Sequence, residues 1–198
     1  DNNVVIGSSS LTTQIEAGVA NDGNVIVGSE SGTKIINGGN VFVGYKSGQK
    51  NKGINNTIIG YNAQSFNSIE QETENNTIIG RDAGKNLRGD KNIVMGVSAG
   101  ESDVTNKVDS NILIGYESGK INNKYNNLFV IGNNSGKLIR DSTNTYYTES
   151  ENIVLGNNSL PAINSYGNLV VGNNVGTNIT TGENNNLIGE KTGNSLVS

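Results

Sequence analysis

Residues 40–48 read Asn40-Val41-Phe42-Val43-Gly44-Tyr45-Lys46-Ser47-Gly48, and closely similar stretches recur along the whole chain of 198 residues. Each copy has an Asn, two or three apolar residues, a Gly, two variable residues, a small residue and usually a second Gly. The first glycine of the motif occurs eleven times, at positions 7, 28, 44, 60, 80, 96, 115, 132, 156, 172 and 189, in steps of 21, 16, 16, 20, 16, 19, 17, 24, 16 and 17 residues. The shortest step is 16 residues, and some steps are longer. This pattern indicates a solenoid with coils of fixed length and insertions at one corner.

The residues before each motif glycine predict a short strand. Counted from that glycine, positions -1 and -2 are apolar in all eleven copies, and position -3 is apolar except at Thr57, Thr77 and Asn186. Val and Ile dominate these positions, and both favour strands. We therefore predict an all-β fold, a parallel β-solenoid of about eleven 16-residue coils. Residues 1–198 are expected to form a single repeat domain, a segment of a longer chain.

The strand pattern also predicts a partner. Successive side chains of a strand point to opposite faces, so apolar residues at both -1 and -2 require a cover on both faces. The remainder of each repeat is too polar to supply the second layer, although a weaker second strand could close the coil. A second copy of this chain around a common axis is the simplest cover. Either the -1 and -3 columns or the -2 column would then face the neighbouring copy.

The conserved glycines and asparagines of the repeat have structural explanations. Gly at positions 0 and +4 brackets a corner in which a positive φ is expected. Asn at position -4 is expected to form a ladder of stacked amides that hydrogen-bond from coil to coil. In the copy that ends at Gly132 the Asn is shifted by one place to Asn127, which predicts a β-bulge in that strand.

The composition argues against several functional classes. The chain has no Cys and no His, the formal net charge is -4, and no basic run stands out. We therefore expect no catalytic residue, no bound cofactor or metal, and no nucleic-acid partner. No apolar run of membrane-spanning length occurs, so this segment is not expected to insert into a membrane. A left-handed β-helix acyltransferase, whose hexapeptide repeat reads similarly, would need an 18-residue period and a catalytic His.

From Asn3 to Gly193 the pattern Asn-x-Val-x-Ile-Gly-x-x-Ser/Ala-x-Gly resembles the head repeats of YadA-like trimeric autotransporter adhesins, the haemagglutinin-like head repeats. It is also similar to repeats in fibre proteins of phages and large DNA viruses. The resemblance implies a left-handed β-roll, three copies of which associate side by side in a homotrimer. It further implies an extracellular location, at a bacterial cell surface through an outer-membrane anchor or at a virion surface.

The function expected from this resemblance is a non-enzymatic adhesin head or shaft module, a virulence factor for attachment to host cells or matrix. Its partners would be further copies of itself and a host surface protein, matrix component or glycan. Two alternatives remain open: a virion or phage fibre segment, and a structural extracellular filament subunit. The flanking sequence would distinguish among the three.

The longest insertion, between Gly132 and Gly156, is the candidate ligand-binding segment. Loops on a rigid scaffold often carry binding residues, and exposed Tyr suits recognition. This insertion occurs once per chain, whereas the other surfaces repeat. The alternative is a tolerated corner insertion without a binding role. The candidate ligand-binding residues are Arg140, Asp141, Tyr146, Tyr147, Glu149 and Glu151, and the corner that carries Tyr45, Tyr61 and Tyr116 is the second choice.

Overall fold

Eleven short strands, one from each repeat, make up the regular structure of the protein. The computed structural model describes residues 2–12, 22–67, 70–102, 107–120, 126–137, 151–160, 166–179 and 182–194. No helix occurs within these ranges. The strands are β1 (Val4–Ile6), β2 (Val25–Val27), β3 (Val41–Val43), β4 (Thr57–Ile59), β5 (Thr77–Ile79), β6 (Ile93–Met95), β7 (Ile112–Ile114), β8 (Phe129–Ile131), β9 (Ile153–Leu155), β10 (Leu169–Val171) and β11 (Asn186–Ile188).

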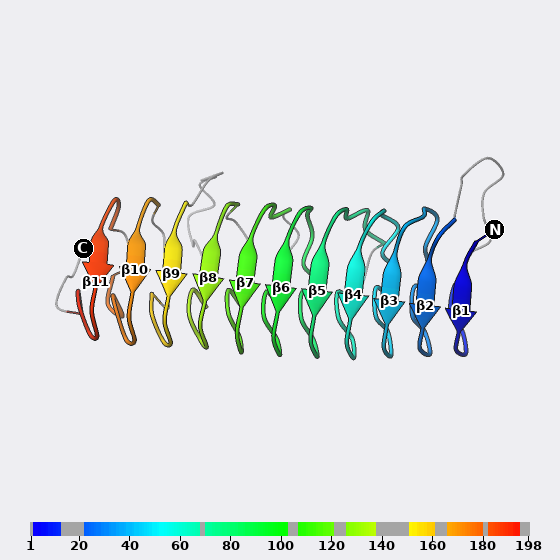
Figure 1. Cartoon of the computed structure of the whole chain (residues 1–198), viewed down its shortest axis with the longest axis horizontal. Helices are drawn as coiled ribbons and strands as arrows, with labels where there is room; N and C mark the ends of the chain where they lie inside the picture. Colours follow the sequence, from blue (N-terminus) through cyan, green and yellow to red (C-terminus); the bar gives the residue numbers. More distant parts are fainter. Residues whose placement is uncertain are drawn as a thin grey trace.

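All eleven strands belong to one parallel sheet whose spatial order follows the sequence order, from β1 at one end to β11 at the other (Figure 1). The register is the same throughout, because each position pairs with the equivalent position of the next coil. Ile58, for example, pairs with Ile78, and Ile78 pairs with Val94. The prediction of a parallel β-solenoid with one strand per repeat is confirmed.

The middle residue of each strand points into the coil. From β2 to β10 this residue, at position -2, has no solvent exposure, and at β11 Leu187 is 6% exposed. By contrast, the residues at -1 and -3 are half-buried or exposed in every strand. The -2 column is therefore the interior column, and the columns at -1 and -3 form the outer face of the sheet. The core column consists of Ile26, Phe42, Ile58, Ile78, Val94, Leu113, Val130, Val154, Val170 and Leu187.

The corner after each strand explains the glycines. Gly80, at position 0, has a φ of 137°, and a Cβ added there would lie 2.5 Å from the carbonyl oxygen of Gly96 in the next coil. At position +4, Gly48 has a φ of 57°, and a Cβ there would collide with the ring of Phe42. The predicted positive φ is confirmed at both positions. The conformation at +4 persists where Gly is absent, since Leu11, Gln64 and Leu160 also have positive φ.

The small residue at +3 faces the crowded interior of the corner. Ser31, Ser47, Ala83 and Ala99 are all fully buried there. The serine hydroxyls donate to backbone carbonyls, as from Ser47 to Ile58 at 2.7 Å. Val175 stands at the same position and is also fully buried, so the corner accepts a side chain as large as Val there.

The asparagines at -4 form the predicted interior ladder. The Oδ1 of Asn76 accepts hydrogen bonds from both the backbone N–H and the Nδ2 of Asn92, at 2.9 and 3.1 Å. The Oδ1 of Asn92 accepts the same pair from Asn111, at 3.0 Å each. The ladder runs without a break through Asn3, Asn24, Asn40, Asn56, Asn76, Asn92 and Asn111, and again through Asn152, Asn168 and Asn185.

The predicted bulge at Gly132 is wrong. Strand β8 pairs in uniform register with β7 and with β9, so no extra residue is inserted. Asn127 occupies position -5, where its positive φ of 58° matches those of Asn55 and Asn75 in other coils. Leu128 stands in the ladder position instead, where it is buried in the core and donates its backbone N–H to the Oδ1 of Asn111. The side chain at -4 was replaced while the backbone kept its path.

A second strand does not close the coils within the described residues. Only two isolated parallel bridges occur there outside the sheet, between Asn51 and Gln71 and between Arg88 and Lys107. Apolar residues at +7 still contribute to the core, because Ile35, Leu87 and Ile179 are buried.

The amide ladder generates a prediction about stability. Replacing Asn92 with Ala removes the acceptor for two buried donors of Asn111, and this loss should lower the free energy of unfolding by about 3 kcal/mol. Asn173→Ala is the matched control, since its Oδ1 accepts the same pair of bonds from Asn157 in an exposed row. Water can replace that acceptor, so the control should cost less than about 1 kcal/mol. Equal losses in denaturant unfolding of the two variants would contradict a special role for the buried ladder.

Candidate interaction surfaces

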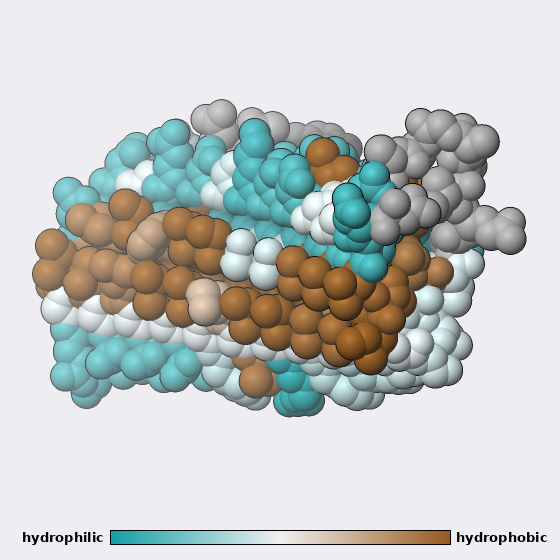
Figure 2. Space-filling view, turned by 45° about the vertical axis from the view of Figure 1, so that its right-hand side comes forward, coloured by the Kyte–Doolittle hydropathy of each residue, from teal (hydrophilic) through white to brown (hydrophobic). Residues whose placement is uncertain are grey.

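The outer face of the sheet is an apolar strip that runs the length of the solenoid. Figure 2 shows it as a long hydrophobic band, interrupted in one row by paler residues, between two hydrophilic regions (Figure 2). Ile59, Ile93, Met95 and Ile153, which lie well inside the stack, are 36–41% exposed. A sheet face in contact with water normally carries polar residues. We call the side chains at positions -1 and -3 of β1–β11 the apolar strip.

The apolar strip is as large as the largest apolar patches that soluble single chains expose, which are often functional. With about 4.8 Å between strands, eleven strands form a strip about 50 Å long and about 10 Å wide, or on the order of 500 Å² in projection. Monomeric soluble proteins seldom expose contiguous apolar patches larger than a few hundred Å². Among the described residues, no segment of this chain covers the strip.

The corner beside the strip carries the residues at +1 and +2. Those at +2 have a positive φ although none is Gly, as at Lys46, Asn62 and Asp82. Backbone hydrogen bonds to the preceding coil hold them there, such as Asn62 N–H to the carbonyl of Tyr45 at 2.7 Å. The repeat thus presents two variable side chains per coil from a fixed backbone.

Two tyrosines stand next to each other at this corner. The rings of Tyr45 and Tyr61 have centroids 5.2 Å apart and planes inclined by 30°. Glu30 fixes the first ring, because its carboxylate accepts from the hydroxyl of Tyr45 at 3.1 Å and pairs with Lys46 at 3.6 Å. The ammonium group of Lys46 lies 5.1 Å from the centroid of the Tyr45 ring. The hydrogen bond with Tyr45, together with the Glu30 charge, raises the pKa of Lys46 above 10.5.

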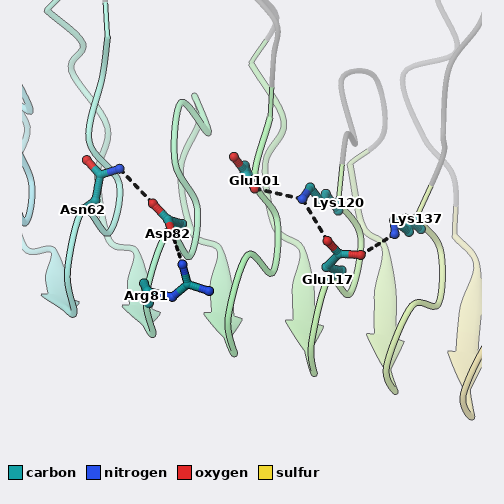
Figure 3. Close-up of polar contacts among 7 residues, drawn as sticks. All are labelled: Asn62, Arg81, Asp82, Glu101, Glu117, Lys120 and Lys137. Carbon is teal, nitrogen blue, oxygen red and sulfur yellow. Dashed lines mark hydrogen bonds and ion pairs between the residues drawn. The ribbon is translucent and has the colours of Figure 1, made fainter.

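The next coils continue the corner with planar polar groups. Asn62 donates to Asp82 at 2.8 Å, and Arg81 pairs with the other oxygen of Asp82 at 3.3 Å (Figure 3). The guanidinium side chain of Arg81 is 62% exposed. Further along, the +1 column becomes a row of amides, in which the backbone N–H of Asn133 donates to the Oδ1 of Asn157 and that of Asn157 donates to the Oδ1 of Asn173.

An ion-pair chain crosses three coils on the same side of the molecule. Lys120 lies 3.1 Å from Glu101 and 2.9 Å from Glu117, and Glu117 also pairs closely with Lys137 (Figure 3). The hydrogen bonds from Lys137 and then Lys120 lower the pKa of Glu117 below 4.5. Burial alone would lower the pKa of Lys120, but its hydrogen bonds to Glu117 and Glu101 outweigh burial and raise that pKa. This ion-pair chain stabilises the stacking of the three coils electrostatically.

A second charged group ties the insertion between Gly60 and Gly80 to earlier coils. Glu70 pairs closely with Lys52 and lies 3.6 Å from Lys34. The hydrogen bond from Lys52 lowers the pKa of Glu70, and the charge of Lys34 adds to this effect. These pairs are substantially exposed, so their contribution to stability is small.

Most of the ligand-binding residues predicted from sequence lie outside the described residues. These are Arg140, Asp141, Tyr146, Tyr147 and Glu149. Glu151 is described: it is exposed, has a φ of 43°, and precedes the ladder residue Asn152. The adjacency of Tyr45 and Tyr61 was readable from their shared position in successive repeats, whereas the bracing by Glu30 required the structure.

Neither a candidate metal-binding group nor a membrane-spanning helix occurs in the described residues. Within the described ranges, no three or more acidic side chains gather in a group that could hold a metal ion. In the same part of the chain, no helix has the length and apolarity needed to cross a membrane.

The ion-pair chain predicts a pH-dependent contribution to stability. A carboxylate whose pKa is lower in the folded than in the unfolded state stabilises the fold above its unfolded pKa, and this contribution is lost as the pH falls through the folded value. Glu117→Gln should therefore lower the free energy of unfolding by about 1 kcal/mol at neutral pH. The difference from the unmodified protein should shrink as the pH falls below 4.5.

The control for this prediction is Glu190→Gln, because among the described residues Glu190 pairs only with Lys191, at 3.7 Å, and both side chains are more than 60% exposed. The control should change stability little at any pH. Chemical denaturation of both variants at several pH values provides the measurement, and a pH-independent loss in Glu117→Gln would contradict the electrostatic explanation.

Comparison with known proteins identifies no relative: no protein-family model matches this chain, and no curated protein or solved structure is significantly similar to it.

Proposed function

We propose that this chain is a non-enzymatic surface module, the head or shaft of an adhesin that attaches to host cells or matrix. In this proposal three copies associate side by side, in parallel, as left-handed β-rolls. The assembly lies outside the cell, on a bacterial or virion surface, and holds ligand-binding residues away from that surface. The observation that carries the proposal is the apolar strip.

The apolar strip supports self-association for two reasons. It is straight and in register, since every strand pairs at the same position with its neighbours, so an identical strip from another copy can follow it over the full length. It is also apolar at nearly every position, and burial of apolar surface is the main favourable term in protein association. The number three and the parallel direction come from the resemblance to adhesin head repeats.

The burial of the strand residues favours one pair of columns for the proposed interface. The -2 column lies inside the coil and is unavailable to a partner. Of the three strand columns, those at -1 and -3 therefore remain for a neighbouring copy. The repeated surface of a rod built in this way suits mechanical extension and multivalent attachment.

Mutation of the apolar strip tests the association. The combined variant Ile59→Glu, Ile93→Glu and Met95→Glu should fold but sediment as a monomer of 20.8 kDa, whereas the unmodified chain should sediment at three times that mass. A control variant places charges in the interior column and should misfold. It combines Ile58→Asp, Ile78→Asp and Val94→Asp. An unmodified chain that sediments as a stable monomer would refute the proposal.

Cysteine cross-linking tests the direction, since the chain contains no Cys. Val27 in β2 and Val171 in β10 lie on the strip near opposite ends of the solenoid. In a parallel assembly, equivalent positions of neighbouring copies lie close together. The Val27→Cys variant alone should therefore form a disulfide between the two copies of Cys at position 27, and the Val171→Cys variant alone should do so at position 171. In an antiparallel dimer neither would react alone, but a mixture of the two variants would.

Deletion tests the attachment role of the long insertion. Removing residues 141–150 should leave the association state unchanged and abolish attachment to cells or matrix, because the longest insertion in the sequence occurs once per chain. Attachment at undiminished strength would move the binding site to another surface of the same module.

A further inference from the structure

The corner that carries Tyr45 and Tyr61 has the features of a binding surface rather than of a solvated turn. Elsewhere in the same column no two aromatic residues are adjacent, and the other residues at +1 are Ser8, Ser29, Arg81, Val97, Tyr116, Asn133, Asn157, Asn173 and Glu190. Here two aromatic rings stand side by side, and Tyr61 is 55% exposed. Such rings expose apolar area to water without contributing to the core.

The first ring is held in place before any ligand arrives. The hydroxyl of Tyr45 donates to Glu30, which also accepts from Gln49 at 3.1 Å and pairs with Lys46. Tyr61 packs against this braced ring. Because the rings are already ordered, a ligand that stacks on them loses little affinity to the ordering of side chains.

Planar polar groups border the rings on the side of the next coil. Arg81 follows Tyr61 in the +1 column, and Asn62 and Asp82 occupy +2 in the same two coils, joined by hydrogen bonds. Amide, carboxylate and guanidinium groups can each pair with two neighbouring hydroxyls. We call Tyr45, Tyr61, Asn62, Arg81 and Asp82 the tyrosine ledge.

We propose that the tyrosine ledge binds a neutral, extended oligosaccharide. The C–H faces of the sugar rings would stack on Tyr61 and Tyr45, and the sugar hydroxyls would pair with Asn62, Asp82 and Arg81. This inference rests on the attachment role proposed above, but it does not require that copies of the chain associate.

Two observations favour this ligand class over others. The charges at the ledge cancel, with Glu30 against Lys46 and Asp82 against Arg81, so a nucleic acid or sulfated polymer finds no excess of positive charge. The area of two rings is also far below the roughly 800 Å² per partner that a stable protein interface buries. Successive coils repeat the +1 position at about 4.8 Å along a straight line, which suits a linear polymer.

The test uses the full chain and two immobilised probes, a hexamer of β-1,4-linked N-acetylglucosamine and a heparin-derived sulfated oligosaccharide. Tyr61→Ala should weaken binding to the neutral hexamer by roughly tenfold, the upper range for a lost aromatic stack. Tyr61→Phe keeps the ring and should bind as the unmodified chain does. Tyr116→Ala is the matched control, because Tyr116 is 49% exposed but has Val97 and Asn133 beside it in the column instead of a second ring.

Each other outcome would overturn the inference. It fails if the neutral hexamer does not bind, if Tyr61→Ala binds it normally, or if Tyr116→Ala weakens binding as much as Tyr61→Ala. Preferential binding of the sulfated probe would make the corner an anion site. Sedimentation of each variant separates this result from the proposed function: dissociation of copies by Tyr61→Ala would assign the ledge to the subunit contact.

Discussion

The close approach of successive coils at the motif glycine is the constraint on which the remaining structure depends. A side chain at Gly80 would enter the space of the Gly96 carbonyl in the next coil, so the coils can stack at this distance only if every copy has a glycine there. The same corner must then be repeated in each coil, which explains why the step never falls below 16 residues. Additional residues are accepted only on the far side of the coil, between the second glycine and the next Asn. Fixed corners and variable far sides are two consequences of one steric limit.

This limit also determines how the coils are held together. When equivalent backbones lie in register, each Asn at -4 is positioned to accept from the Asn of the next coil, and each side chain at -2 packs on its own equivalent. Leu128 shows which part of the arrangement is indispensable. It replaces the ladder amide with an apolar side chain, yet its backbone N–H still reaches Asn111 at 3.0 Å, and the register of β8 is unchanged. The backbone geometry persists through a gap in the amide ladder, so the ladder stabilises the stack but the backbone path defines it.

Most of the fold could be predicted from the sequence because each property was repeated in nearly every coil. Strand position, the parallel sheet, the amide ladder and the corner glycines all followed from the periodicity. The contacts made by residues that depart from the repeat could not be predicted, since two such residues can be each other's partner. Gln64 stands where Gly is usual and Asn51 where an apolar residue is usual, and the two are linked by a buried hydrogen bond of 3.0 Å, with Thr73 as a shared partner. Likewise, sequence alone left open which column faces outward, because -1 and -2 are equally apolar and only the path of the corner distinguishes them.

A surface built from repeated rows can acquire specificity only where a row changes its chemistry, and the +1 column changes along its length. In its second half, Asn157 directs both its backbone N–H and its Nδ2 to Asn173, so the amide row satisfies much of its own hydrogen-bonding capacity. Such a row gains little from a ligand, because any new bond must replace an existing one. The ring of Tyr61 packs against Tyr45 but makes no hydrogen bond to the described residues that a ligand would have to replace, and the residue is 55% exposed. Tyr61 therefore keeps its apolar area available, and the scaffold that holds the amides in a self-satisfied ladder leaves the aromatic part of the same column free to bind.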